Sequence, residues 1–357
     1  MNITLFISSL KGGGAERQIA EMANLFSNHG HSVSLVTYSD LEDDYKVCSC
    51  VRRVRLGENK GKIYKWLAIL RYFLTTGDDG IISFFPGCTR FVVLSTLLRY
   101  RRPFKIIAGE RAAILKPSKL QLQMIKSLYR YVDYIVANSY TQAQQIIHLN
   151  PKLVSKTLTI SNYANIGKYT QVILKKNDVL RIAITAHYRP EKNCMGLLQA
   201  INMLRNKTKV HFKFEWYGRI YPDVYHSCKQ YIEDNSLHEY IELMDRVSDV
   251  PGLLKDVDVL CLPSKNEGFS NSITEAICMG LPVLASDISD NSLMVHDGIN
   301  GFLFDPYDID NMCVAFIRFF ELSFDERVAM GKESRRIAEE LFNEEKFVNS
   351  YINLLVK

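Results

Sequence analysis

Short apolar runs of strand length alternate with segments of helical spacing along the first half of this 357-residue chain. The run at 3–10 precedes a helical pattern that ends on Gly30, and glycine, proline and polar residues bound the later runs. These later runs lie at 31–38, 80–85, 104–110, 134–139 and 157–162. Strands that alternate with helices predict βαβ units and a parallel sheet whose faces are covered by helices.

The alternation restarts after a polar stretch at 167–179. Further strands are predicted at 180–188, 211–218, 241–245, 258–264 and 282–286. Helices are predicted between them at 196–204, 250–257 and 271–280, and the charged final segment 323–357 also has helical spacing. We therefore predict an α/β chain with two Rossmann-like domains joined near residue 170.

Composition and charge bring in possible partners. A hydrophobic content of 47% and a charged content of 23% are typical of a soluble globular protein. The N-terminal MNITLFISSL lacks the basic start and the cleavage site of a signal peptide, so we predict a first strand there. No run of 18 apolar residues occurs, and no transmembrane span is expected. Residues 1–170 carry 23 Lys and Arg against 11 Asp and Glu, whereas 171–357 carry 21 against 28, which predicts different partners for the two halves.

Metal and redox chemistry find little support in the sequence. The eight cysteines show no paired metal-ligand spacing, and Cys48-Ser49-Cys50 is one residue too tight for a CxxC site. We predict reduced, buried thiols in a cytosolic protein. The D-x-D triplet at 256–258 resembles some metal sites, but its alternation at the entry to an apolar strand favours a solvent-facing strand end. No metal site is expected.

Loops after strands are the candidate sites, because doubly wound sheets bind ligands where the carboxyl ends of strands lead into helices. The first such loop is KGGGAER at 11–17. Its three glycines permit a tight turn and let backbone N–H groups approach an anion at a helix N-terminus. The loop is neither G-x-G-x-x-G, since Arg17 occupies the third glycine position, nor a P-loop. It is an anion or sugar site, or a plain tight turn.

Two other loops concentrate charge. Glu110 and Arg111 follow a predicted strand, where they bind a polar ligand or form a surface ion pair. His187, Arg189 and Lys192 gather within six positions after another strand. Such a cation cluster suits a diphosphate leaving group, because charge-assisted hydrogen bonds to it strengthen as the bond breaks. Solvated surface charge is the alternative.

Two carboxylates stand eight positions apart in PSKNEGFSNSITEAICMGLP at 263–282. Gly268 argues against one continuous helix, so we place Glu267 on a loop and Glu275 in the first turn of a helix begun by Ser272 or Thr274. The backbone N–H groups of 268–271 then face a phosphate at the helix N-terminus. Both carboxylates are able to accept hydrogen bonds from sugar hydroxyls.

Four segments in order carry a resemblance to a known family: GGGAER at 12–17, RPEKN at 189–193, EGFSNSITEAICMGLPVLASD at 267–287 and DGINGFLF at 297–304. Over essentially its full length the chain resembles retaining nucleotide-sugar glycosyltransferases of the GT-B fold, specifically glycosyltransferase family 4. The resemblance implies two Rossmann-like domains that face a cleft. Residues 1–170 would bind the acceptor, residues 171–340 would bind the nucleotide-sugar, and a C-terminal helix at 341–357 would cross back to the N-terminal domain.

The resemblance also implies roles for particular residues. Catalytic positions are Glu267, Lys192, Arg189 and Arg111. Donor-binding positions are Glu275, Gly268, Phe269, Ser270, Asn271, Gly13, Gly14, His187 and Arg246, and acceptor-binding positions are Arg17 and Glu110. In this scheme Glu267 contacts the donor sugar's hydroxyls, Glu275 holds the ribose and Lys192 stabilises the departing diphosphate. Gly13 and Gly14 approach the diphosphate from the other domain, and no metal or cofactor is required.

Three positions depart from the family pattern. The phosphate loop usually begins Gly-Arg, but here it begins Ala186-His187. Arg189 or a protonated His187 would supply the lost charge. Arg111 stands where many members carry histidine, and Leu293 stands where the family often has glutamate.

We expect transfer, with retention, of a hexose or N-acetylhexosamine from a UDP- or GDP-sugar to a lipid-linked or growing saccharide acceptor in bacterial cell-surface glycan biosynthesis. The resemblance implies a front-face route in which the leaving phosphate helps deprotonate the acceptor hydroxyl. The alternatives are a GT-B-fold sugar-nucleotide epimerase or phosphorylase, and a non-catalytic membrane-associated scaffold with the same fold.

The basic N-terminal half adds an expected membrane partner. Segments 62–73, 97–105 and 116–131 mix Lys and Arg with Trp, Tyr, Phe and Leu. Such segments lie on an anionic bilayer or form helices packed in the domain with solvated basic faces. We expect a cytoplasmic protein that is peripheral on the inner face of the cell membrane, with a polyprenyl-diphosphate-linked or saccharide acceptor. No nucleic-acid-binding module accompanies the basic charge, so nucleic acid is not an expected partner.

Overall fold

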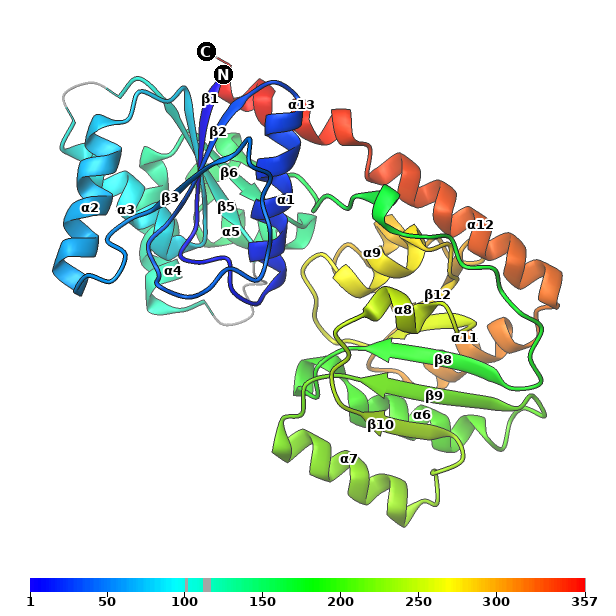
Figure 1. The fold of residues 1–357 in the computed structure, drawn as a ribbon. Helices are drawn as coiled ribbons and strands as arrows, with labels where there is room; N and C mark the ends of the chain where they lie inside the picture. The colour runs from blue at the N-terminus through cyan, green and yellow to red at the C-terminus, as the bar shows by residue number, and fades with distance from the viewer. Residues whose placement is uncertain (100–101, 112–116, 357) are drawn as a thin grey trace. The chain divides into compact units, whose positions relative to one another are not determined.

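A computed structural model describes residues 1–99, 102–111 and 117–356 of the chain, which forms two compact units (Figure 1). Unit 1 combines Met1–Tyr163 with the C-terminal Asn343–Lys357, and unit 2 is Ala164–Phe342. The sequence placed these boundaries at 170 and 340. The first boundary lies earlier, because Tyr163 is buried in the core of unit 1 whereas Ala164 is buried in the core of unit 2, and the second follows Phe342.

Unit 1 is built on a seven-stranded sheet in the order β3-β2-β1-β4-β5-β6-β7, and all its neighbouring pairs are parallel. The strands are β1 (Asn2–Phe6), β2 (Ser32–Thr37), β3 (Arg52–Arg55), β4 (Gly80–Phe84), β5 (Lys105–Glu110), β6 (Tyr134–Ala137) and β7 (Thr157–Thr159). The parallel sheet that the alternation predicted is confirmed. The edge strand β3 was not predicted, because three of its four residues are arginine.

Helices cover both faces of this sheet. They are α1 (Gly14–Asn28), α2 (Lys62–Thr75), α3 (Pro86–Leu97), α4 (Lys119–Gln123), α5 (Tyr140–Leu149) and α13 (Glu344–Leu355), with a π-helical turn at Met124–Leu128 and 3₁₀ turns at Tyr129–Tyr131 and Pro151–Lys156. α1 and α13 share one apolar core with alternate residues of β1 and β2. α2, α3 and α5 pack in a second core on the other residues of the same strands. Burial on both faces explains why these strands are nearly continuous apolar runs.

Unit 2 is built on a six-stranded parallel sheet in the order β10-β9-β8-β11-β12-β13. Its strands are β8 (Leu180–Thr185), β9 (Phe212–Tyr217), β10 (Ile241–Met244), β11 (Val259–Leu262), β12 (Val283–Ser286) and β13 (Gly301–Phe304). The five predicted strands are confirmed, and β13 is an additional edge strand. In both sheets the chain order reverses beside the first strand, which is the topological switch point where such sheets bind ligands.

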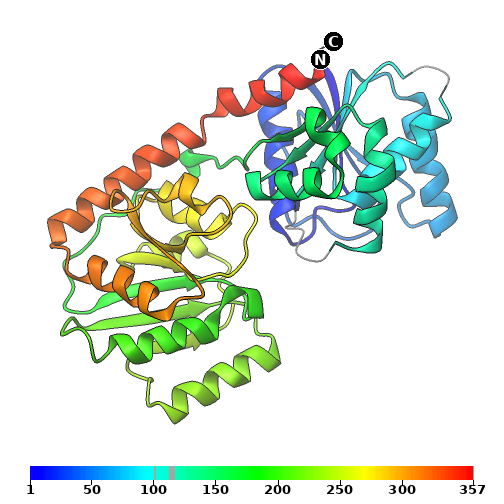
Figure 2. The ribbon, with the colours of Figure 1, turned by 180° about the vertical axis from the view of Figure 1, so that it is seen from behind.

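The helices of unit 2 are α6 (Cys194–Leu204), α7 (Pro222–Asp234), α8 (Val250–Leu254), α9 (Asn271–Cys278), α10 (Asn291–Met294), α11 (Ile309–Phe320) and α12 (Phe324–Leu341). Short 3₁₀ turns lie at Ile166–Lys168 and Pro190–Lys192. α6 and α11 contact each other (Figure 2), and α9 contacts α12. A capping box of Ser323 and Glu326 begins the long α12. Within the described residues, no helix is long and apolar enough to span a membrane.

The cysteine prediction is wrong at one place. Cys48 and Cys50 form a disulfide across the single intervening serine. The other six cysteines of the described chain are buried and lie outside any disulfide, as predicted. Spacing rules for CxxC sites do not cover the tighter CxC ring, so the pattern gave no sign of this bond.

Candidate functional site

The carboxyl edge of the unit 2 sheet gathers most of the predicted site residues. The loops after β8, β9, β10 and β11 begin at 186, 218, 245 and 263, and parallel strands place all four at the same edge. Lys192 and Arg189 come from the first loop, Arg246 from the third and Glu267 from the fourth. The site is therefore assembled from segments that lie far apart in the sequence.

Lys192 and Glu267 form an ion pair within this edge. Lys192 Nζ lies 2.5 Å from Glu267 Oε1, and the two side chains are only 20% and 11% exposed. Ser264 Oγ donates to the same carboxylate oxygen at 2.6 Å. Ser289 Oγ donates to the backbone carbonyl of Glu267 at 2.7 Å. These contacts orient the carboxylate and leave the ammonium group beside the loop that precedes α9.

The helix after Glu267 begins at Asn271, as the helical pattern at 271–280 predicted, and earlier than the start at Ser272 or Thr274 that we also inferred. Ser270 is its N-cap and its side chain accepts from the backbone N–H of Ile273, so α9 starts at Asn271. Glu275 therefore lies in the second turn and not in the first, and it is 8% exposed. Ser272 Oγ donates to the carbonyl of Thr185 at 2.7 Å, which ties α9 to the end of β8.

Only some of the predicted donor-binding residues in the loop before α9 are accessible to a ligand. Phe269 and Ser270 are buried, and Phe269 makes an edge contact with Phe342 in the core of unit 2. Their side chains thus hold the loop in place. Gly268 and Asn271 are half-buried. The loop offers a ligand its backbone groups and the side chain of Asn271 more readily than the two buried side chains.

A cluster of cations surrounds His187. Burial lowers the pKa of His187, and the charges of Arg189, Lys192, Arg246 and Arg219 lower it further. The Nδ1 atom accepts from the backbone N–H of Arg219 at 3.3 Å. The lowered pKa favours the neutral form of His187 at neutral pH, which makes Arg189 the better candidate for the positive charge that this position in the phosphate loop lacks.

Arg219 and Tyr221 are the functional candidates that the sequence reasoning missed. Both lie on the loop after β9, and the guanidinium carbon of Arg219 is 5.7 Å from the centroid of the Tyr221 ring. Arg189 lies 4.5 Å from the centroid of the Tyr221 ring, donates to its hydroxyl, and lies 3.8 Å from Glu191. The signal was available, because an arginine directly after the predicted strand at 211–218 obeys the same strand-end rule as Arg189.

The backbone brings these loops into close approach. A Cβ at Gly218 would collide with the carbonyl oxygen of Ala186, so only glycine fits there. Trp216 Nε1 donates to the same carbonyl at 2.7 Å. Tyr188 is buried, and its hydroxyl lies 2.8 Å from the carbonyl oxygens of both Trp216 and Met244. The ends of β8, β9 and β10 are thereby fixed relative to one another.

The glycine-rich loop of unit 1 follows β1 and leads into α1. Gly12 has a φ of +88°, and Tyr45 donates to its carbonyl at 3.2 Å. α1 starts at Gly14 with Gly13 as its N-cap, and the carboxylate of Glu16 lies against Gly13. Burial raises the pKa of Glu16. An anion at this helix N-terminus would have to displace that side chain, so the anion and tight-turn readings both remain predictions, as does the role of Arg17.

Glu110 and Arg111 have separate partners in unit 1. Glu110 is 2% exposed, accepts a hydrogen bond from the Tyr129 hydroxyl, and burial raises its pKa to about 8 despite the charge of Arg111. Arg111 donates to Asn162 Oδ1 at 3.1 Å and to the hydroxyl of Tyr351 on α13. Its guanidinium also lies 4.2 Å from the centroid of the Phe84 ring. The predicted acceptor and catalytic roles are untested, and here both side chains make packing contacts.

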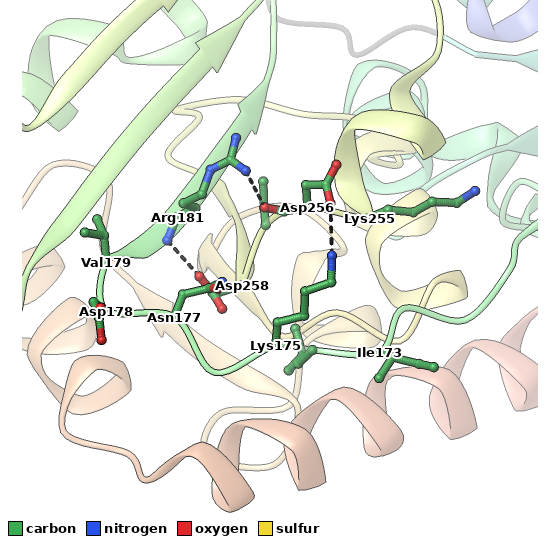
Figure 3. A pocket seen from close by; sticks show the side chains of 11 residues that line it. Ile173, Lys175, Asn177, Asp178, Val179, Arg181, Lys255, Asp256 and Asp258 are labelled. Carbon is green, nitrogen blue, oxygen red and sulfur yellow. Dashed lines mark hydrogen bonds and ion pairs between the residues drawn. The ribbon is translucent and has the colours of Figure 1, made fainter.

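The D-x-D triplet lies at the opposite edge of the unit 2 sheet, where a cavity of about 350 Å³ opens before β8 and β11 (Figure 3). Asp258 is buried and accepts from the backbone N–H of Arg181 at 2.8 Å, whereas Asp256 is exposed and lies 3.6 Å from Lys175. The prediction of a solvent-facing strand end is thus wrong for Asp258. Across the described residues, no three His, Cys, Asp or Glu side chains gather as metal ligands would.

Comparison with known proteins agrees with this architecture. Residues 179–321 match the model of the family Glycosyl transferases group 1. The chain is 25% identical over 216 residues to the UDP-Gal:alpha-D-GlcNAc-diphosphoundecaprenol alpha-1,3-galactosyltransferase of Escherichia coli, a match that covers 54% of this chain and 55% of that protein. It is 24% identical over 320 residues, or 84% of each chain, to the GalNAc-alpha-(1->4)-GalNAc-alpha-(1->3)-diNAcBac-PP-undecaprenol alpha-1,4-N-acetyl-D-galactosaminyltransferase of Campylobacter jejuni.

Among solved structures, HepE of Anabaena in complex with UDP matches 99% of both chains, with a TM-score of 0.78 and 16% identity. That likeness shows the fold. The resemblance to GT-B glycosyltransferases of the family 4 type, stated from the sequence, is confirmed. The chain has the fold of the GT-B glycosyltransferases, and its residues 179–321 are similar to the Glycosyl transferases group 1.

Proposed function

We propose that the carboxyl edge of the unit 2 sheet binds a nucleotide diphosphate sugar. The observation that carries this proposal is the cation cluster of Arg189, Lys192, Arg219 and Arg246 around His187. Such a group of cations next to a helix N-terminus is suited to a diphosphate. The relatives support the choice of donor, because one is named as a UDP-galactose transferase and a structural neighbour was solved with UDP.

We assign the transferred group to the hexose or N-acetylhexosamine class. Glu267 accepts hydrogen bonds from its hydroxyls, with its orientation set by Lys192 and Ser264. Glu275 holds the ribose, and the backbone of 268–271 lies along the phosphates. Because Glu275 is 8% exposed, the ribose would have to approach α9 closely to make this contact.

The proposed reaction is transfer with retention. An acceptor hydroxyl oxygen forms a bond to the anomeric carbon on the face from which the diphosphate leaves. The bond between that carbon and the diphosphate oxygen breaks, and its electron pair stays on the leaving nucleoside diphosphate. A phosphate oxygen takes the hydroxyl proton. Lys192 and the neighbouring arginines stabilise the negative charge that develops, which is where fixed cations accelerate transfer most.

We propose a lipid-linked or growing saccharide as the acceptor, in bacterial cell-surface glycan biosynthesis. Both curated relatives described above are named for undecaprenol-linked acceptors. Charge supports the same choice, since residues 1–170 carry 23 Lys and Arg against 11 Asp and Glu and would favour an anionic leaflet. We therefore propose a peripheral location on the inner face of the cell membrane.

The test is a donor-consumption assay with a panel of UDP- and GDP-sugars and extracted lipid-linked saccharides. Glu267→Gln and Arg219→Gln should each lower turnover by about 10²-fold, as expected when one group that stabilises developing charge is lost. Lys209→Gln is the matched control, because this exposed lysine precedes β9 at the opposite edge of the sheet. Wild-type turnover in both site variants would contradict the assignment.

Product analysis separates the alternatives. An epimerase would convert the nucleotide-sugar with no acceptor present, and a phosphorylase would require inorganic phosphate. A scaffold would bind no nucleotide-sugar in calorimetry. Retention of the anomeric configuration, read by proton NMR of the product, tests the proposed stereochemistry.

A further inference from the structure

The outer face of α2 and α3 in unit 1 exposes an unusual number of large apolar side chains. They come from four positions on α2 and three at the end of α3, namely Ile63, Tyr64, Trp66, Leu67, Leu94, Leu97 and Leu98. Ile63 is 76% exposed and Leu98 is 68% exposed. Ile69 and Phe73 of α2 are buried, so the helix already satisfies the core with its other face. The exposed apolar side chains of α2 therefore lie outside the core of unit 1.

A groove runs between these two helices. It has a volume of about 320 Å³ and is lined by Trp66, Leu70, Phe91, Leu94, Ser95, Leu97 and Leu98. Trp66, Leu94, Leu97 and Leu98 of the exposed set line this groove, and Ile63, Tyr64 and Leu67 lie on the same helix as Trp66. We call these seven side chains and the groove the α2–α3 face. Monomeric soluble proteins rarely expose contiguous apolar patches of this kind unless a partner covers them.

A polar cavity of about 480 Å³ adjoins the groove, and Leu97 lines both. Its cations are Arg102, Arg130 and Lys156, and Asp133 is the carboxylate that lines it. Arg102 lies 2.8 Å from Asp133, which leaves the charges of the other two cations uncompensated within this cavity. The cavity therefore has a net positive charge next to an apolar groove.

More basic side chains lie on the same two helices. Lys62 and Arg71 of α2 are exposed, and Arg90 of α3 is half-buried. Lys65 differs, because it forms an ion pair with Asp40 at 2.6 Å. A mixture of exposed Trp, Leu and Ile with Lys and Arg is the composition of a surface that lies at the interface of an anionic bilayer.

We propose that the α2–α3 face docks on an anionic phospholipid leaflet, with its apolar side chains among the acyl chains and a lipid phosphate in the cavity of Arg102, Arg130 and Lys156. Charge complementarity favours this occupant over a second copy of the chain, since two such faces would bring their cations together. This inference names the surface behind the peripheral membrane location in the proposed function. It rests on that function only for the reason why the chain would bind a membrane.

The proposed docking surface overlaps the three segments that the sequence analysis named as candidates for membrane contact. Segment 62–73 supplies α2, and the start of segment 97–105 supplies Leu97 and Leu98, although residues 100 and 101 lie outside the described residues. Segment 116–131 contributes Arg130, while its Met124, Ile125 and Tyr129 are buried in the core of unit 1. Residue 116 also lies outside the described residues.

Tryptophan fluorescence reads this docking directly. The chain has two tryptophans, and Trp216 is buried in unit 2 whereas Trp66 lies in the groove and is 46% exposed. The purified full chain is titrated with vesicles of phosphatidylcholine alone and of phosphatidylcholine with phosphatidylglycerol. We expect a blue shift of Trp66 emission, and quenching by brominated acyl chains, with the anionic vesicles only.

Sedimentation of the same vesicles measures the partition constant of variants. Leu67→Ser with Leu98→Ser should weaken partition by about tenfold or more, because two exposed leucines lose their transfer from water. Arg71→Gln with Arg130→Gln should weaken it by about 25-fold, since each basic residue near the surface contributes about fivefold. Val154→Ser, an exposed apolar position elsewhere in unit 1, and Lys209→Gln with Lys332→Gln in unit 2 are the controls and should leave partition unchanged.

Three results would overturn the inference. One is partition that the α2–α3 variants leave unchanged, and another is equal binding to neutral vesicles. The third is a dimer in light scattering that the two leucine substitutions dissociate while vesicles go unbound, which would make this face an interface between copies. The assay needs neither donor nor acceptor, so its failure is separate from a failure of the proposed transfer reaction.

Discussion

Lys192→Met separates the two functions that the ion pair with Glu267 combines. The lysine Nζ lies 2.5 Å from the carboxylate, and both side chains are mostly buried. Methionine keeps most of the length of the side chain and removes the charge. The variant thus loses a cation in the proposed diphosphate site and leaves Glu267 without its ionic partner.

The variant should lose both unfolding free energy and turnover. Breaking a buried ion pair by removing one partner costs about 3–5 kcal/mol of unfolding free energy. Here the cost should be about 1–3 kcal/mol, because both side chains keep some contact with water and Ser264 still donates to the carboxylate. Turnover should fall by about 10²–10³-fold if the ammonium group stabilises the leaving diphosphate.

The double variant Lys192→Met with Glu267→Gln distinguishes these effects. Removing both charges leaves no unpaired carboxylate, so stability in urea unfolding should return to within about 1 kcal/mol of the wild type. Turnover, measured as release of nucleoside diphosphate, should stay at or below the level of the single variant. A double variant that regains turnover along with stability would refute the reasoning, since Lys192 would then act only as a structural partner.

Three further predictions concern the framework of the two units. Gly218→Ala should lower stability by about 2–4 kcal/mol and abolish transfer, because the added Cβ collides with Ala186; an unchanged thermal midpoint would contradict this close approach. Glu110→Gln should flatten the pH dependence of the unfolding free energy. The Glu110 carboxyl has a pKa of about 8 in the folded chain against an ordinary 4.5. The wild type therefore loses stability as pH rises between these values, on the order of 1 kcal/mol per pH unit. If the wild type and Glu110→Gln lose the same unfolding free energy between pH 5 and pH 8 in urea, this prediction is wrong. Tyr351→Phe should cost about 1–3 kcal/mol, because Arg111 loses the buried hydroxyl that accepts its hydrogen bond, and equal urea midpoints would exclude that contact.

The strands and the fold class were predictable because burial on both faces of a parallel sheet leaves long apolar runs in the sequence. The edge strand β3 escaped prediction for the matching reason, because it is partly exposed and rich in arginine. β13 is mostly buried, and in the sequence it was recognised only as part of the motif at 297–304. Their pairing depends on neighbouring strands, which a local pattern does not contain.

The site was predictable loop by loop but not as an assembly. Arg219 is 32 residues from His187 and meets it only because β8 and β9 are paired in parallel register. The pairing of Lys192 with Glu267 spans 75 residues in the same way. The start of α9 depends on one side-chain hydrogen bond of Ser270, whereas residue preference alone also allowed Ser272 or Thr274.

The central claim is that fixed cations at the carboxyl edge of the unit 2 sheet hold a nucleoside diphosphate. Isothermal titration of the wild-type chain with UDP and GDP tests it most directly, with and without EDTA and at two salt concentrations. We predict micromolar binding of one nucleotide, unchanged by EDTA, weakened by salt and lowered at least tenfold in Arg219→Gln. Binding of neither nucleotide, or binding that Arg219→Gln leaves intact, would contradict the account.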